Sequence, residues 1–116
     1  MKRLLLIAAL AVAPVAAAAE GTPRNDVQEL YGYCKETGGS QRLTYCLGYI
    51  AGIGQLMRQM GHNQEMHQYG LCSDQGISTG AMVQAFRNWA EQNPRSWNVD
   101  AVLGVGAALA TAWPCK

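Results

Sequence analysis

Residues 40–60 read SQRLTYCLGYIAGIGQLMRQM, and this stretch decides the fold. Its apolar side chains recur every three or four residues, the spacing that places them on one face of an α-helix. Ser40 is suited to cap the N-terminus of that helix, and Gly48 and Gly52, one turn apart, are expected to let another backbone segment approach closely. The apolar stripe consists of Leu43, Cys46, Leu47, Ile50, Ile53, Met57 and Met60.

A shorter helix is predicted before this stretch. Asn25 and Gln28 have the spacing of a capping box at its start. The glycine pair 38–39 is suited to its end, because glycine readily adopts the left-handed conformation that terminates helices. Its apolar stripe consists of Val27, Leu30, Tyr31 and Cys34.

Two further helices are predicted in the second half of the chain. The third begins at Ser78 or Thr79 and ends before Pro94, which cannot continue a helical hydrogen-bond ladder. The fourth begins near residues 96–98. Residues 61–77 lack a sustained period and are expected to form a long connection, a feature that is often functional in a small domain. The expected inward face of the fourth helix consists of Val99, Val102, Leu103, Gly106, Leu109, Ala110 and Trp113.

No segment alternates between apolar and polar residues as a half-buried strand would. The predicted fold class is therefore all-α, a small disulfide-stapled bundle of about four helices arranged as two antiparallel hairpins. The chain of 116 residues is long enough for one domain.

The first residues have the layout of a secretory signal peptide. Lys2 and Arg3 precede an apolar run over residues 4–13, and small residues 15–19 follow. We expect cleavage after Ala19, a mature domain over residues 20–116 and a periplasmic location. The apolar stretch 101–113 is shorter than the roughly 20 residues that span a bilayer, so no membrane association is expected in the mature form.

Charge and cysteine content narrow the function classes further. Without Lys2 and Arg3, the 9 Lys+Arg become 7 against 8 Asp+Glu, a balance that argues against nucleic-acid binding. Four cysteines in an exported domain predict two disulfides. Because each short turn places consecutive helices side by side, we expect the pairs Cys34–Cys46 and Cys72–Cys115.

The sequence contains no recognisable catalytic or metal-binding motif. No serine lies in a nucleophile elbow, no cysteines are spaced C-x-x-C, and His62 and His67 are five residues apart, off one helical face. We therefore expect no enzyme activity, no cofactor and no metal, and a binding function instead.

Loops that carry aromatic residues and methionine are the best candidates for a partner interface. The 61–70 loop is the first choice and the 94–98 turn is the second. The loop is equally compatible with a solvated linker, and Trp97 with a residue that covers the end of a hairpin. Tyr45 and Tyr49 fit either a dimer contact or ordinary half-burial. The candidate partner-binding residues are His62, Asn63, Glu65, Met66, His67, Tyr69, Arg95 and Trp97.

Several short motifs, in this order and with this cysteine framing, resemble the Tai-type immunity proteins. They are Leu30-Tyr31 before Cys34, residues 46–53 (CLGYIAGI), Cys72 leading into Gly76-Ile77-Ser78, Asn93-Pro94, and the closing Ala112-Trp113-Pro114-Cys115. The resemblance covers roughly residues 26 to 115. It implies a small periplasmic helical protein, often a homodimer, that presses a loop into the catalytic groove of a type VI secretion peptidoglycan amidase effector.

Two other classes stay open at the level of sequence. One is a small periplasmic helical chaperone or stress protein, which would gain client protection and dye binding at pH 2–3. The other is an envelope binding module without a toxin partner.

Overall fold

A computed structural model describes residues 23–116, so the predicted signal peptide, residues 1–19, lies outside the described residues. The described part of the chain contains four α-helices and no β-strand, which confirms the all-α class. None of these helices has both the length and the apolar character needed to cross a membrane. The helices are α1 (Val27–Cys34), α2 (Gln41–His62), α3 (Thr79–Gln92) and α4 (Ala101–Ala112), with short 3-10 turns η1 (His67–Tyr69) and η2 (Pro94–Ser96).

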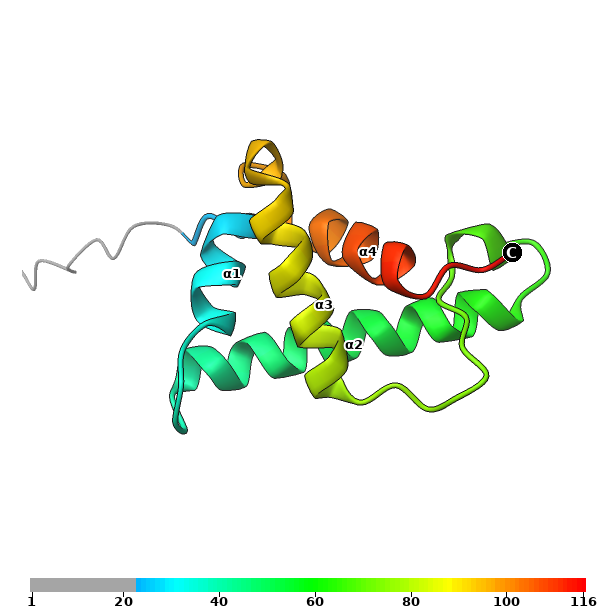
Figure 1. Cartoon of the computed structure of the whole chain (residues 1–116), viewed down its shortest axis with the longest axis horizontal. Helices are drawn as coiled ribbons and strands as arrows, with labels where there is room; N and C mark the ends of the chain where they lie inside the picture. The colour runs from blue at the N-terminus through cyan, green and yellow to red at the C-terminus, as the bar shows by residue number, and fades with distance from the viewer. Residues whose placement is uncertain (1–22) are drawn as a thin grey trace, which may run out of the picture.

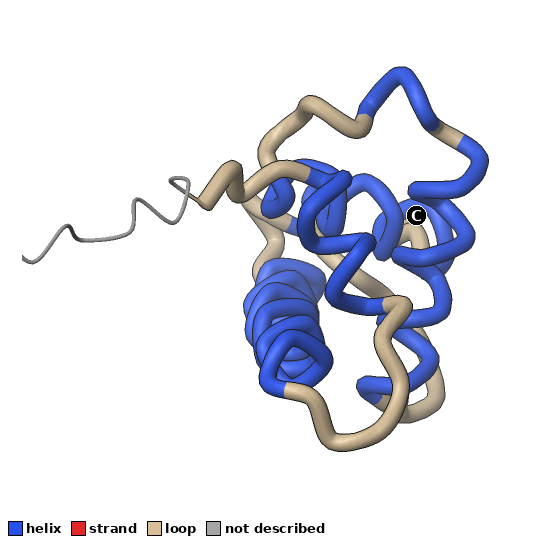
Figure 2. Tube along the Cα trace, turned by 90° about the vertical axis from the view of Figure 1, so that its left-hand side faces the viewer, coloured by secondary structure: helices blue, strands red, loops and turns tan. Residues whose placement is uncertain are grey.

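The long helix α2 is the base on which the others pack. Figure 1 shows α2 along the long axis, with α4 above it and running in the same direction, while α1 and α3 stand steeply to both. Figure 2 is turned by a quarter and views α2 nearly end-on. Connections join α1 to α2 and α3 to α4 as predicted, but within each pair the helices cross steeply (Figure 1) and do not lie antiparallel as expected. One buried cluster receives residues from all four helices, with Phe86 and Ile50 among its largest fully buried side chains.

The predicted start of α1 is wrong by one residue. Asp26, rather than Asn25, is the N-cap, and its carboxylate accepts a hydrogen bond from the Glu29 backbone N–H at 2.9 Å. Glu29 in turn accepts from the Asn25 backbone N–H at 2.8 Å. Asp26 and Glu29 therefore provide the capping contacts expected of Asn25 and Gln28, although Glu29 accepts from the residue before the N-cap and not from the N-cap itself.

The predicted end of α1 is also corrected. The helix ends at Cys34, before the glycine pair 38–39. The Lys35 N–H still donates to Tyr31 O, but the Glu36 N–H donates to Tyr33 O, a shorter step that closes the last turn. Gly38 has a positive φ of 74°, as expected for glycine, within the connection to α2.

The fourth helix starts later than residues 96–98, because residues 97–99 complete the N-terminus of α1. Backbone N–H groups of Val27 and Gln28 donate to Val99 O and Trp97 O at 2.9 and 3.1 Å. The first N–H groups of a helix have no partner within it, and here the turn after η2 supplies the acceptors. This turn ends at Asp100, which forms an isolated antiparallel bridge with Asp26 and precedes α4.

The predicted inward face of α4 is wrong at Val99, Val102 and Leu103, which are exposed, whereas Ala110 and Trp113 are half-buried against the core. Leu109 is buried as expected, but Val102 and Leu103 are 49% and 62% exposed. Helix α4 carries apolar residues on every side, so the spacing of its apolar residues does not define one inward face. The glycine at 104 sets the contact, since a Cβ there would collide with Val27 and press on the Trp89 ring. The buried residues of α4 are Ala101, Gly104, Val105, Ala108 and Leu109.

The close contact expected at Gly48 and Gly52 is absent, because nothing lies within 4 Å of where either Cβ would be. The close contact on α2 is at Gly54 instead, where an added Cβ would collide with the Met82 side chain. The N-cap expected at Ser40 is confirmed by a 3.0 Å hydrogen bond from the Leu43 N–H.

Both predicted disulfides are present. Cys34–Cys46 joins α1 to α2, and Cys72–Cys115 joins the connection after η1 to the C-terminal tail. No cysteine among the described residues is free. Each helix hairpin therefore carries one covalent cross-link.

Candidate partner-binding surface

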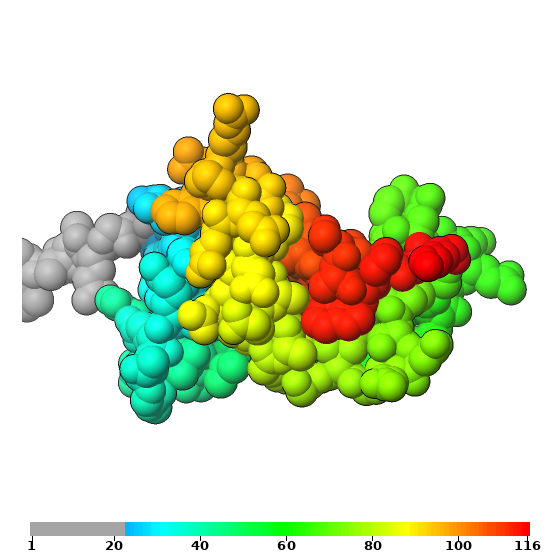
Figure 3. All heavy atoms as spheres, in the orientation of Figure 1, coloured from blue at the N-terminus to red at the C-terminus, as the bar shows by residue number. Residues whose placement is uncertain are grey.

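Residues 62–69 form a projecting segment between the end of α2 and Gly70. In Figure 3 it stands out beside the C-terminal tail, at the end of the molecule opposite α1. Asn63 orders its first turn, because its side-chain oxygen accepts hydrogen bonds from the backbone N–H groups of Glu65 and Met66 at 2.9 and 3.2 Å. The connection predicted from the lack of periodicity is therefore a defined turn followed by η1.

Close backbone contact holds the base of this segment. Gly70 lies against the backbone of Gly61, so that a Cβ at Gly70 would collide with main-chain atoms. The Leu71 N–H donates to Met57 O at 3.0 Å, and Leu71 itself is buried. The segment is thus closed on itself at residues 61 and 70.

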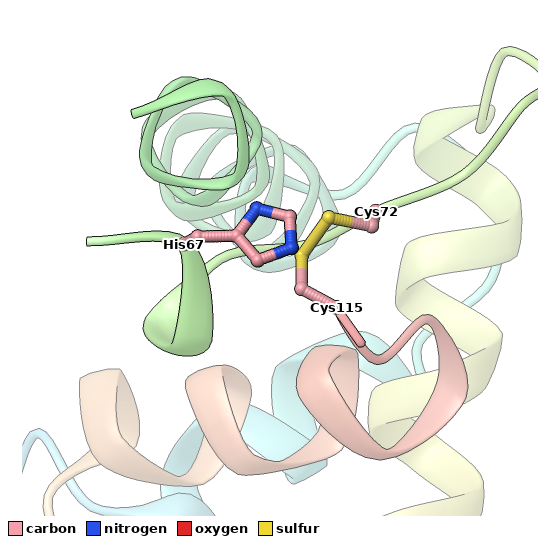
Figure 4. A group of neighbouring side chains, drawn as sticks. All are labelled: His67, Cys72 and Cys115. Atoms are coloured by element: carbon pink, nitrogen blue, oxygen red, sulfur yellow. A yellow bond between two sulfur atoms is a disulfide. The ribbon is translucent and has the colours of Figure 1, made fainter. Parts of the chain in front are cut away.

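His67 and a disulfide connect the segment to the C-terminal tail. The His67 Nδ1 lies 2.6 Å from Gly61 O, and the second ring nitrogen, Nε2, lies 3.1 Å from Lys116 O. Beside it, Cys72 is bonded to Cys115, and the Cys72 N–H donates to Trp113 O at 3.1 Å. Figure 4 shows the imidazole directed at the sulfur atoms.

Six of the eight predicted binding residues share this projecting segment. Tyr69 and Met66 are 63% and 40% exposed. The imidazole of His67 is half-buried and occupied by the contacts above, so it supports the segment more than it presents a surface. The exposed members of the set are His62, Asn63, Glu65, Met66 and Tyr69.

The other two predicted residues lie elsewhere. Figure 1 places η2 at the far end of α3, well away from the projecting segment. Arg95 is exposed, but Trp97 is half-buried, donates its indole N–H to Ala90 O at 2.8 Å and packs against the Tyr31 ring. Its side chain has the structural contacts of a residue that covers the end of a hairpin.

An apolar groove beside the projecting segment was not predicted. Leu56 and Leu103 stand 58% and 62% exposed on its sides, and Tyr69 links it to the segment. The hollow has a volume of about 390 Å³, and no charged side chain lines it. We call it the α2–α4 groove; its lining is Ile53, Leu56, Met57, Met60, Gln68, Tyr69, Val102, Leu103, Gly106, Ala107 and Ala110. The sequence signal that could have predicted this groove is the presence of apolar residues on every side of α4.

A row of tyrosines lies at the opposite end of α2. The Tyr45 ring is 5.8 Å from that of Tyr33 and 5.7 Å from that of Tyr49. A hydrogen bond to Glu29 raises the pKa of Tyr33, and burial raises the pKa of Tyr49. Tyr49 is half-buried in the core, whereas Tyr45 is 49% exposed and covers its neighbours. Packing against the core accounts for the half-burial of Tyr49.

Comparison with known proteins identifies the family. Residues 26–115 match the Rap1a immunity proteins, from the N-cap of α1 to the last cysteine. No curated protein and no solved structure matches the chain significantly. The expected class, an immunity protein, is therefore confirmed, while the resemblance to the Tai type stays a prediction. The chain belongs to the Rap1a immunity protein family.

Proposed function

We propose that this protein is a periplasmic, non-enzymatic immunity protein that binds a type VI secretion peptidoglycan amidase effector and blocks its active site. Membership of an immunity family supports the class of function. The single observation that carries the choice of surface is the projecting segment 62–69, closed at its base and cross-linked to the tail.

The proposed inhibition is steric. Exposed Met66 and Tyr69 provide apolar contact, and His62, Asn63 and Glu65 provide polar contact at the same tip. A segment already ordered before binding loses little conformational entropy in the complex, so more of the contact energy appears as affinity. Once the tip occupies the catalytic groove of the effector, peptidoglycan can no longer reach the nucleophile.

Export supports the periplasmic assignment. The two disulfides suit an oxidising compartment, and residues 1–19 have the sequence of a signal peptide. N-terminal sequencing of the mature protein tests this part: we expect it to begin at Glu20, and a retained Lys2 would contradict it.

We also propose that two copies associate through the α2–α4 groove. Interfaces between permanent subunits are more apolar than transient ones, and this groove is apolar, whereas the tip of the projecting segment is mixed. A two-fold contact places the same patch on both sides, and an uncharged patch brings no like charges together. Leu56 and Leu103 lie beside small Gly106, Ala107 and Ala110, so each copy offers both a protrusion and a space to receive one.

Sedimentation of the purified protein tests this association. We expect a dimer that Leu103→Lys converts to a monomer. Leu47→Lys is the matched control, because Leu47 is an exposed leucine of α2 outside the groove. A dimer that survives Leu103→Lys and dissociates with Leu47→Lys would contradict the proposed face.

Peptidoglycan hydrolysis tests the function itself. An amidase encoded beside this gene should lose activity when mixed with one equivalent of the protein. Replacing Met66, which lies outside the α2–α4 groove, by Asp should weaken inhibition at least tenfold, the effect of losing one strong interface contact. Arg95→Glu, at the other end of the molecule, is the control. Unchanged hydrolysis by the amidase would overturn the proposal, and gain of client protection at pH 2–3 would favour a chaperone.

A further inference from the structure

One histidine and one cysteine pair meet at the base of the projecting segment. The ligand-type atoms of His67, Cys72 and Cys115 all lie within 4.8 Å of one another, and all three residues are half-buried. Figure 4 shows them coming from three separate places: η1, the connection that follows it and the C-terminal tail. Imidazole nitrogen and thiolate sulfur are the ligands that zinc prefers in proteins.

The histidine already has the orientation of a metal ligand. Each ring nitrogen faces a main-chain oxygen, Nδ1 at 2.6 Å from Gly61 O and Nε2 at 3.1 Å from Lys116 O. In the tautomer that donates from Nδ1 to Gly61 O, the lone pair lies on Nε2, the nitrogen nearer the sulfur atoms. Metal-bound histidines almost always donate their other N–H to a carbonyl or carboxylate in this way.

The remaining atoms leave room for an ion. A surface hollow of about 320 Å³ adjoins His67 and Cys72, and Arg58, His62 and Asp74 also line it. Tetrahedral zinc holds its ligand atoms about 3.6 to 3.8 Å apart, so the two sulfur atoms must move apart once their bond is reduced, while the imidazole nitrogen already lies within 4.8 Å of both. Binding at Nε2 would displace only the exposed Lys116, whose oxygen lies 3.1 Å away.

The other cysteine pair provides an internal comparison. Cys34 and Cys46 are 2% and 0% exposed within the core. Both histidines of the chain, His62 and His67, lie at the opposite end of α2. Among the described residues, only the group at the C-terminal tail joins cysteine sulfur with imidazole.

We propose that reduction of Cys72–Cys115 creates a zinc site formed by Cys72, Cys115 and His67. Two sulfur atoms bonded to each other cannot both act as thiolate ligands, so the site exists only in the reduced protein. Two thiols of a reductant supply two electrons and two protons and become a disulfide, while Cys72 and Cys115 become thiols. Zn²⁺ then displaces both thiol protons, and water completes the coordination. The ion replaces the covalent bond as the link between the segment and the tail.

Cobalt binding after mild reduction tests the site. A phosphine reductant suits the test, because it becomes a phosphine oxide and competes weakly for metal. It should first open the half-buried pair and leave the buried Cys34–Cys46 pair intact, which alkylation and peptide mapping verify. We expect one equivalent of Co²⁺ to bind, with a sulfur-to-cobalt charge-transfer band and the intense visible bands of four-coordinate cobalt, and Zn²⁺ to displace it.

Variants decide which residues hold the ion. His67→Asn should weaken Zn²⁺ binding at least tenfold, and His62→Asn, the matched control in the same segment, should not change it. Cys72→Ala with Cys115→Ala should abolish the cobalt bands even when Cys34 and Cys46 are reduced. If reduction lowers helical circular dichroism, Co²⁺ should restore it. Absence of the bands in reduced protein, or equal binding by the His67→Asn variant, would overturn the proposal.

Discussion

The two disulfide-bonded regions of the molecule differ in what the cross-link holds. Cys34–Cys46 joins two helices inside the core, where both residues are buried, over a separation of 12 residues. Cys72–Cys115 spans 43 residues, lies at the half-buried surface, and neither of its cysteines belongs to a helix. The first bond therefore adds to packing that already exists, whereas the second orders segments with little packing of their own.

One end of this small domain therefore contributes mainly to stability, and the other end carries the proposed binding surface. The end of α2 near α1 is surrounded by the cluster of Val27, Leu30, Cys46 and Ile50. The other end presents exposed side chains on a segment fixed by a disulfide, one imidazole and a glycine contact. Binding surfaces are commonly such loops held by a rigid scaffold.

The largest expected effect comes from removing the surface disulfide. Replacing Cys72 and Cys115 by Ala should cost about 4 kcal/mol of unfolding free energy in the chain-entropy model, against about 3 kcal/mol for Cys34 and Cys46. Denaturant unfolding measures both values. Hydrogen exchange of the native state should also accelerate in residues 61–72 for the first variant alone. If the Cys34/Cys46 variant releases that segment instead, the comparison fails.

Tight glycine contacts should give the next largest effects, one in each region. Gly70→Ala forces a Cβ onto the Gly61 backbone, and Gly104→Ala forces one onto Val27. Overpacking of this kind costs about 1–3 kcal/mol. We expect Gly70→Ala to weaken effector inhibition as well, and Gly104→Ala to lower the melting temperature with inhibition retained.

Gly52→Ala is the matched control for both glycine variants. Nothing lies within 4 Å of its added Cβ, and alanine favours a helix interior by up to about 1 kcal/mol. Its melting temperature should stay the same or rise. A loss of stability similar to that of Gly104→Ala would show that close contact is not the cause.

The smallest effect concerns the cap of α1. Burial acts to raise the pKa of Asp26, but hydrogen bonds from the Glu29 N–H and the Arg24 side chain outweigh it, and the pKa lies below its usual value. The stability it contributes is present above the unfolded pKa of about 3.9 and is lost as pH falls through the lower folded value. Asp26→Asn should cost less than about 1 kcal/mol at pH 7 and progressively less towards pH 2.

Thermal unfolding of both proteins between pH 7 and pH 2 measures this difference. The melting temperatures of the wild type and Asp26→Asn should converge in acid. A gap that widens as pH falls would contradict the lowered pKa.

The helices and disulfides could be predicted because their signals are local. Ser40 and Ser78 cap their helices as expected. The cysteine pairing could be predicted because short connections place consecutive helices, and the cysteines next to them, side by side. The α1 cap was shifted because Asn25 and Asp26 are adjacent and both suit an N-cap. The late start of α4 depends on hydrogen bonds between residues 27–28 and 97–99, and no local pattern reveals such distant pairing.

The surface was predicted only in part for the same reason. Residues 62–69 were recognisable as a polar connection containing Met66 and Tyr69. The exposed face of α4 was not, because a helix with apolar residues on every side has no spacing that distinguishes Leu103 from Leu109. The contact between His67 and the disulfide joins residues far apart in sequence, so only the folded chain places them together.

Hydrogen exchange of the protein alone and in complex with the amidase tests the central claim most directly. If the segment fixed by Cys72–Cys115 enters the effector, amides of residues 62–70 should exchange more slowly in the complex, while those of residues 93–98 should not change. Slower exchange confined to residues 93–98, with residues 62–70 unaffected, would contradict the assignment of the binding surface.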